Sequence, residues 1–332
     1  MGTYIARRLL QSVVILFGLA VIFFFILHLT PGGPCAAEEG TGLRGKLQQR
    51  SCAHRLGLNQ PLYVQFIKQM GPYLEGNLGT SNSGEPVAQE FTDALPATVV
   101  LIGVSYALQL LLAIPLGIFA ALYRYSFFDQ VFTFFSYVGF SMPSFWLGLI
   151  LIFIVAVHFH ALPAGNIVST NIPIFWTSGW FHLLEHDPAL VLGDLARHLV
   201  LPVITLLIVG VAGDSRYMRA SLLDVLHQDY IRTAKAKGLK HRIVVFKHAL
   251  RNAILPIVTN IALDLPSLVG GAVITETIFS WSGLGFLYIQ ELNVSDYPTI
   301  EALLMISAVA VLLSNLLADV VYAWVDPRIR YD

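Results

Sequence analysis

The chain has few charged residues for its length. Only 12% of its 332 residues are Asp, Glu, Lys or Arg, whereas 56% are hydrophobic and the net charge is -1. Ordinary soluble domains carry about 25% charged residues. This shortage of charge excludes an ordinary soluble domain and indicates that the chain lies in a lipid bilayer.

A complete nucleotide-binding motif is also missing. Gly40, Gly45 and Lys46 fit the start of the phosphate-binding pattern G-x-x-x-x-G-K, but Leu47 stands where the Mg-binding Ser or Thr belongs, and no strand pattern precedes it. The sequence holds no other candidate, so we expect any ATP hydrolysis to come from a separate polypeptide. We predict no catalytic residue, no metal site and no cofactor in this chain.

Long apolar runs define the fold class. A helix needs about 20 mostly apolar residues to cross about 30 Å of hydrocarbon. Six runs approach that length: 9–29, 97–122, 131–157, 199–218, 254–279 and 302–325. The sequence therefore predicts an all-α, polytopic membrane protein with six transmembrane helices. The first run exceeds the apolar part of a cleaved signal peptide, about 7–15 residues, so we expect it to be a retained anchor.

The distribution of positive charge predicts the orientation. With the N-terminus in the cytoplasm, 14 of the 20 Lys and Arg residues lie inside and six lie outside: Arg44, Lys46, Arg50, Arg55, Lys68 and Arg197. Because positive charge is enriched in cytoplasmic loops, both termini are predicted to be cytoplasmic. The chain then divides into an N-terminal tail with the first helix (1–29), an extracytoplasmic segment (30–94) and a core with five transmembrane helices (95–332).

Cysteine is scarce. The two cysteines, Cys35 and Cys52, both fall in the predicted extracytoplasmic segment, where a disulfide is permitted. A bond between them would close a loop of about 17 residues and stabilise the protein by roughly 3 kcal/mol. Two free thiols are the alternative.

One long basic stretch interrupts the apolar pattern. Residues 216–251 contain nine of the Lys and Arg residues, opposed by Asp224 and Asp229, and no proline occurs between Pro202 and Pro256. Gly238 is the only glycine of the stretch. Residues 216–251 are therefore predicted to form a helix, a one-glycine turn and a second helix. The four-residue spacing of apolar side chains predicts one buried face, made of Leu222, Leu226, Tyr230 and Ala234.

The same stretch resembles a known family. Thr233, Ala234 and Gly238, with Leu250 twelve positions after the glycine, resemble the EAA loop of ABC-importer permeases. Four segments resemble the dipeptide and oligopeptide branch of this family: QDYIRTAKAKGL, KHALRNAILPIV, residues 270–285 and residues 315–331. The sequence departs from the general pattern at three positions: Arg232 replaces Glu, Arg251 replaces Pro, and Ser282 stands where Pro is expected.

The resemblance implies a type I ABC-importer permease in the bacterial inner membrane. It implies coupling to an ATPase through these residues of the cytoplasmic loop at about 220–255: Thr233, Ala234, Lys237, Gly238, Leu239 and Leu250. The implied partners are a second homologous permease, two cytoplasmic ATPases that bind ATP and Mg, and an extracytoplasmic binding protein. Peptides are the implied substrate. Nickel complexes, glutathione or another small solute are the alternatives.

Several residues are candidates for the transport pathway. Pro143 lies inside an apolar run, where proline kinks a helix. Asp264 and Glu276 are carboxylates in apolar sequence, where charge is costly and is often functional. Trp281 belongs to the segment FSWSGLG, which by resemblance helps to seal the pathway externally. For the proline and the two carboxylates, a structural role in helix packing is the alternative.

Three other functions have weaker support in the sequence. His182, Glu185 and His186 spell H-x-x-E-H, a zinc-protease order, but the Trp residues nearby favour interfacial histidines. A stand-alone secondary transporter could use Asp264 as an ion site, although it would need no basic docking loop. Nucleic-acid binding is not expected, because the positive-inside rule already explains the basic stretch.

Overall fold

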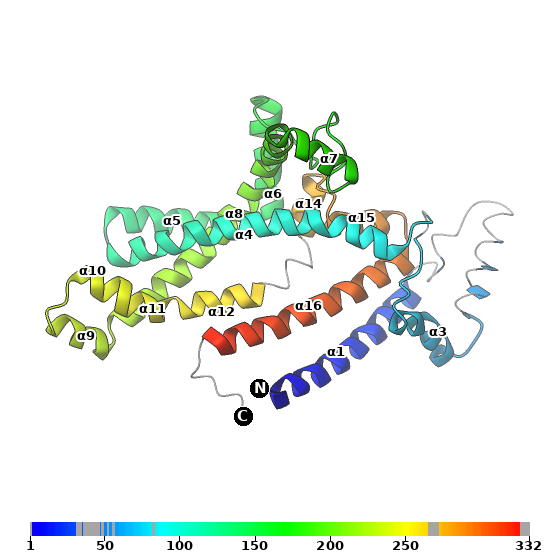
Figure 1. Cartoon of the computed structure of the whole chain (residues 1–332), viewed down its shortest axis with the longest axis horizontal. Helices are drawn as coiled ribbons and strands as arrows, with labels where there is room; N and C mark the ends of the chain where they lie inside the picture. Colours follow the sequence, from blue (N-terminus) through cyan, green and yellow to red (C-terminus); the bar gives the residue numbers. More distant parts are fainter. Residues whose placement is uncertain are drawn as a thin grey trace.

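The computed structural model describes residues 2–30, 35, 47, 50–51, 53–54, 57–81, 84–264 and 272–325. These residues are mostly helical (Figure 1), and one isolated bridge pairs Thr80 with Pro86. The elements are α1 (Gly2–Leu29), α3 (Leu62–Leu74), α4 (Val87–Leu122), α5 (Phe127–Ser141), α6 (Ser144–Leu151), the π-helical segment η2 (Ile152–His158), α7 (Ser178–His186), α8 (Pro188–Leu226), α9 (Asp229–Ala236), α10 (His241–Ile243), the π-helical segment η3 (Val244–Ala249), α11 (Leu250–Ala253), α12 (Leu255–Asp264), α14 (Val273–Ile278), α15 (Leu284–Asn293) and α16 (Tyr297–Val325).

The all-α fold class is confirmed, but the predicted count of six transmembrane helices is not matched exactly. Within the described residues, four helices are long and apolar enough to cross a membrane: α1, α4, α8 and α16. The bent pair formed by α5 with α6 and η2 gives a fifth span if it is counted as one. The predicted span 254–279 corresponds to α12 and α14, and residues 265–271 between them lie outside the described part of the chain.

The longest helices, α4 and α8, form the centre of the molecule. They pack along each other, and α5, α6 and α12 also pack against α8. Close approach is permitted by small residues: a Cβ on Gly117 of α4 would lie 2.5 Å from the Ser215 carbonyl oxygen of α8. Small residues at helix contacts are typical of membrane proteins, because dispersion contacts replace the hydrophobic driving force. Figure 1 shows α6 and α7 projecting to one side of α4.

A second pair of helices, α1 and α16, lies side by side next to this centre (Figure 1). The two run antiparallel, since Arg8 near the start of α1 pairs with Asp319 near the end of α16, with Nε and Oδ2 3.1 Å apart. At the other end of α1, His28 Nε2 lies 2.8 Å from Gln65 Oε1 of α3. Phe24 and Phe66 are packed edge to face beside that contact.

A sharp bend near Pro143 divides the run predicted over 131–157 into two helices. The axes of α5 and of α6 with η2 differ by 99°. Met142 is extended, with φ -77° and ψ 126°, which is the backbone that a following proline favours because its ring clashes with a helical predecessor. Pro143 therefore ends one helix and precedes another, and does not merely kink a continuous one.

The structure describes one of the two cysteines of the predicted disulfide. Cys35 is buried and disulfide-bonded, whereas Cys52 lies outside the described residues. We expect non-reducing peptide mapping of membranes prepared without reductant to recover one cross-linked peptide containing Cys35 and Cys52. Two alkylatable thiols in that preparation would contradict the prediction.

Candidate functional site

The basic stretch folds into an elbow, defined here as residues 227–253, at one end of the molecule (Figure 1). α8 ends at Leu226, and the extended backbone of Gln228 (φ -69°, ψ 150°) starts a new direction for α9. This break changes the helical register, so the predicted face is only partly right. Ile231 is buried in place of Tyr230, which is exposed.

The inner side of the elbow is attached firmly to α8. Ile231 and Ala234 of α9 join a buried apolar cluster with Met218 and Leu222 of α8 and Val244 of η3. Polar contacts add to it at two points: the Ser221 hydroxyl donates to the Ala253 carbonyl at 2.8 Å, and the Asn252 amide donates to the Tyr230 hydroxyl at 2.7 Å. The elbow and the end of α8 therefore form one packed unit.

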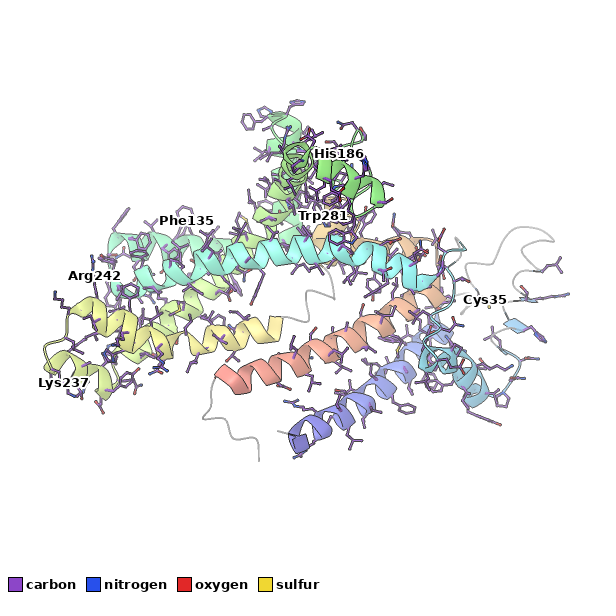
Figure 2. The ribbon with its side chains drawn as sticks, viewed as in Figure 1. Cys35, Phe135, His186, Lys237, Arg242 and Trp281 are labelled. Carbon is purple, nitrogen blue, oxygen red and sulfur yellow. The ribbon has the colours of Figure 1, made fainter. Side chains whose placement is uncertain are left out.

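The outer side of the elbow is positively charged. Its exposed cationic residues are Arg232, Lys235, Lys237, Lys240, Arg242, Lys247 and Arg251, and Figure 2 shows Lys237 and Arg242 at the tip. Gly238 has φ +73°, a left-handed conformation that costs a residue with a Cβ about 1–2 kcal/mol. A Cβ at Gly238 would have no atom of this chain within 4 Å, so the turn is open to a partner.

The residues predicted for coupling divide between these two sides. Thr233, Lys237, Gly238 and Leu239 are exposed on or beside the turn. The other two lie on the packed side: Ala234 is buried and Leu250 is half-buried. The structure thus brings all six onto one elbow, four of them facing solvent.

A charged pair holds the last turns of α8 in place. Arg219 Nε and Nη2 each lie 2.8 Å from an oxygen of Asp129 on α5. Asp129 also accepts from the Tyr125 backbone N–H, and its own N–H is capped by Ser126 at 3.2 Å. Two-pronged arginine–carboxylate pairs fix orientation as well as distance. The turn between α4 and α5 is therefore attached to the helix that carries the elbow.

In a second candidate region, Glu276 of α14 is enclosed by hydrogen-bond donors. Its Oε1 accepts from the Thr98 hydroxyl at 2.9 Å, and its Oε2 accepts from the Gly285 and Phe286 backbone N–H groups at 2.7 and 3.1 Å. The side chain is fully buried. In this conformation Glu276 joins α4, α14 and α15, and its role in a pathway stays a prediction.

The segment after α14 is packed equally closely. Trp281 is fully buried, and its Nε1–H donates to the Ala97 carbonyl of α4 at 2.8 Å. The Leu284 N–H donates to the Thr98 hydroxyl at 2.8 Å. A Cβ on Gly283 would come within 2.6 Å of Glu276 Oε2, so this turn has no room for a larger residue.

The loop before α7 covers this turn. Its Asn166 N–H donates to the Phe279 carbonyl at 2.8 Å. His198 of α8 holds the loop from the other side, since its Nδ1 lies 2.9 Å from the Gly165 carbonyl oxygen. Asp194, one turn earlier on α8, accepts from both the backbone N–H and the hydroxyl of Ser169. The start of α8 is thereby connected to the end of α14.

The charge beside α15 is reduced by its surroundings. Burial raises the pKa of Glu291 to about 7, and the neighbouring carboxylates of Asp296 and Glu90 act in the same direction. At neutral pH the Glu291 carboxyl therefore carries less negative charge than it would carry in water.

The remaining predicted residues are more dispersed. Pro143 is exposed in a hollow of about 580 Å³ that Tyr137 and Trp146 also line. The side chain of Asp264 lies outside the described residues. The rings of His182 and His186 stack 4.3 Å apart, but no cluster of three metal-ligating side chains exists within the described part of the chain.

Sequence reasoning missed the polar partners. Thr98, Asp129 and His198 were not singled out, although each joins elements far apart in the chain. Asp214 of α8, another missed carboxylate, accepts from the Gln109 amide of α4 at 2.7 Å. Asp129 and Asp214 lie in or beside apolar runs, and that position was the available signal.

Comparison with known proteins identifies the family. A family model described as "Binding-protein-dependent transport system inner membrane component" matches residues 113–331, and a model of the N-terminal part of such components matches residues 1–102. The chain belongs to this permease family. The oligopeptide transport permease AppB of Bacillus subtilis is 41% identical over the whole of both chains. The dipeptide transport permease DppB of Escherichia coli is 36% identical over 99% of this chain and 98% of its own.

The family confirms the resemblance found in the elbow. This permease is a multi-pass component of the inner membrane and belongs to a family of transport permeases. Importers of this kind work with ATPase and binding-protein partners.

Replacing the enclosed carboxylate tests the turn that follows α14 in this permease. In Glu276→Gln, an amide N–H₂ faces backbone donors that then lack an acceptor, and each buried unsatisfied donor costs about 1–3 kcal/mol. We expect the unfolding temperature of the purified permease to fall by several degrees. Glu185→Gln, at an exposed position on α7, serves as the control. Equal unfolding temperatures for both variants would contradict the structural role of Glu276.

Proposed function

We propose that this permease forms half of the translocation pathway of an ATP-driven importer of di- and oligopeptides. The observation that carries the proposal is the end-to-end similarity to permeases named for oligopeptide and dipeptide transport. The complete importer contains a second homologous permease, two cytoplasmic ATPases and an extracytoplasmic binding protein. ATP and Mg bind to the ATPases, and this chain needs no cofactor and catalyses no reaction.

The proposed orientation places both termini and the elbow in the cytoplasm. The excess of Lys and Arg on that side supports it. The pair Arg8–Asp319 joins the start of α1 to the end of α16, which supports placing both termini on the same side of the membrane. Residues 30–94 then face the opposite side, where the binding protein delivers substrate, and residues 95–332 form the core.

The elbow is the proposed contact with the ATPase. Its cationic outer side, with Lys237 and Leu239 beside the glycine turn, offers charge and exposed apolar side chains to a groove. Its inner side is packed on α8 through Ile231 and Ala234. A movement of the ATPase therefore displaces the end of α8 and does not merely bend a loose loop.

α8 is the element that carries this movement outward. It has 39 residues, about 58 Å at 1.5 Å per residue. One end holds the elbow, and the other holds the loop over Phe279 through Asp194 and His198. Closure of the ATPase pair on ATP thus switches the pathway from inward-facing to outward-facing by shifting α8 against α14 and the Trp281 turn.

Transport by the reconstituted complex tests the function. The tagged permease is purified from its native membrane with its partners and placed in liposomes, and uptake of labelled di-, tri- and pentapeptides is measured. We expect accumulation that requires ATP, the ATPases and the binding protein. Uptake without any ATPase would indicate a secondary transporter. Uptake of nickel complexes or glutathione in place of peptides would contradict the substrate class.

Substitution of the elbow glycine tests the coupling. Val is β-branched and disfavours the φ of +73° at Gly238, so Gly238→Val should distort the turn while the spans insert normally. We expect normal membrane levels, less co-purified ATPase and loss of peptide uptake.

Gln228→Ala, at an exposed position on the same elbow, is the matched control and should transport normally. Wild-type uptake with a full complement of ATPase in Gly238→Val would exclude this coupling role.

A further inference from the structure

A large apolar pocket lies between α1, α3, α16 and the start of α4. Its volume is about 810 Å³, and its walls include Phe17 of α1, Phe66 and Met70 of α3, and Met305 and Val309 of α16. The hydroxyl of Tyr73 is the one polar side-chain group among the lining residues, and it already donates to Glu301 at 3.4 Å. The pocket is the size of a small-molecule site, but it offers almost nothing to hydrogen-bond.

The pocket lies at membrane depth. α1 and α16 are both candidate spans. At 1.5 Å per residue, the lining residues of α1 are about 14–24 Å from Leu29, and those of α16 are about 12–24 Å from Tyr297, which is at the same end of this antiparallel pair. Both ranges fall inside a hydrocarbon layer of about 30 Å. The two helices therefore line the pocket at the same level of the bilayer.

The residues that the structure describes leave this space unfilled. Val13 and Phe17 on α1 are 62% and 61% exposed, and Leu74 on α3 is 92% exposed. α1 is fastened near its two ends, by Arg8 to Asp319 and by His28 to α3, with the pocket between these attachments. An empty gap here forfeits the dispersion contacts of its lining. In a bilayer, the surrounding molecules able to supply those contacts are lipid chains.

We propose that this pocket binds an acyl chain of a bilayer phospholipid, which fills the gap between α1 and α16 beside α3. The site selects the apolar chain and not the headgroup, since it presents no ionised side chain among the lining residues. The bound acyl chain packs against α3. The Gln69 amide also attaches α3 to Glu301 of α16, at 2.7 Å. This inference depends on membrane insertion and is independent of the substrate proposed above.

Photo-crosslinking to lipid tests the proposal. The complete transporter is placed in nanodiscs of phosphatidylethanolamine and phosphatidylglycerol that contain a phospholipid with a diazirine in its acyl chain. After illumination, labelled peptides are mapped. We expect residues 13–20 and 305–313 to be labelled several-fold more strongly than Phe134 and Phe135, which are exposed on α5 and report ordinary surrounding lipid.

Two glycine variants separate the pocket from the lipid-facing surface. Gly71 lines the pocket, and a Cβ there would have no atom within 4 Å, so we use Gly71→Leu to add apolar volume to the pocket. Gly18→Leu on α1 is the matched control, because its Cβ also meets no atom and it does not line the pocket. We expect Gly71→Leu to reduce pocket labelling to the level at α5, and Gly18→Leu to leave it unchanged.

Ala310→Phe, at a second lining position, repeats the test if Gly71→Leu does not fold. Pocket labelling equal to that of α5, or labelling unaffected by both filling variants, would overturn the proposal. A photo-reactive amino acid at Val309 that cross-links to the second permease would overturn it as well, because a protein segment would then occupy the pocket.

Discussion

A buried carboxylate in an apolar chain has to find its compensation within the protein, and this constraint decides where the helices of the permease are joined. Asp129 meets Arg219, Glu276 meets Thr98, and Glu301 meets Gln69. Each contact links elements far apart in the sequence. The apolar helix faces between these contacts can pack against lipid as well as against another helix. The polar contacts therefore determine most of the relative positions of the helices.

The class of the protein and the character of the elbow could be predicted from the sequence. Both depend on local composition: apolar runs long enough to span, and cationic residues gathered around Gly238. The positive φ of that glycine and the exposure of Lys237 and Leu239 agree with the sequence pattern. The family resemblance in the same residues is confirmed by the matching family models.

The breaks and the partners could not be predicted in the same way. The turn at Gln228 contains neither glycine nor proline, so the helical period appeared to continue and placed Tyr230 on the wrong face. Pro143 was recognised, but a bend of 99° depends on what packs on each side. Thr98 and Glu276 are 178 residues apart, and no local pattern relates a hydroxyl in one helix to a carboxylate in another.

The ion pair between Arg8 and Asp319 has a consequence for biosynthesis. Its two residues are separated by 311 positions, roughly 15–60 s of translation at 5–20 residues per second. During that interval the first helix resides in the membrane without its final neighbour. Its tolerance of this delay follows from its apolar surface, with Leu10, Val14 and Phe25 exposed to lipid in the finished protein as well. The anchor can thus enter the bilayer early and be captured late, when α16 is made.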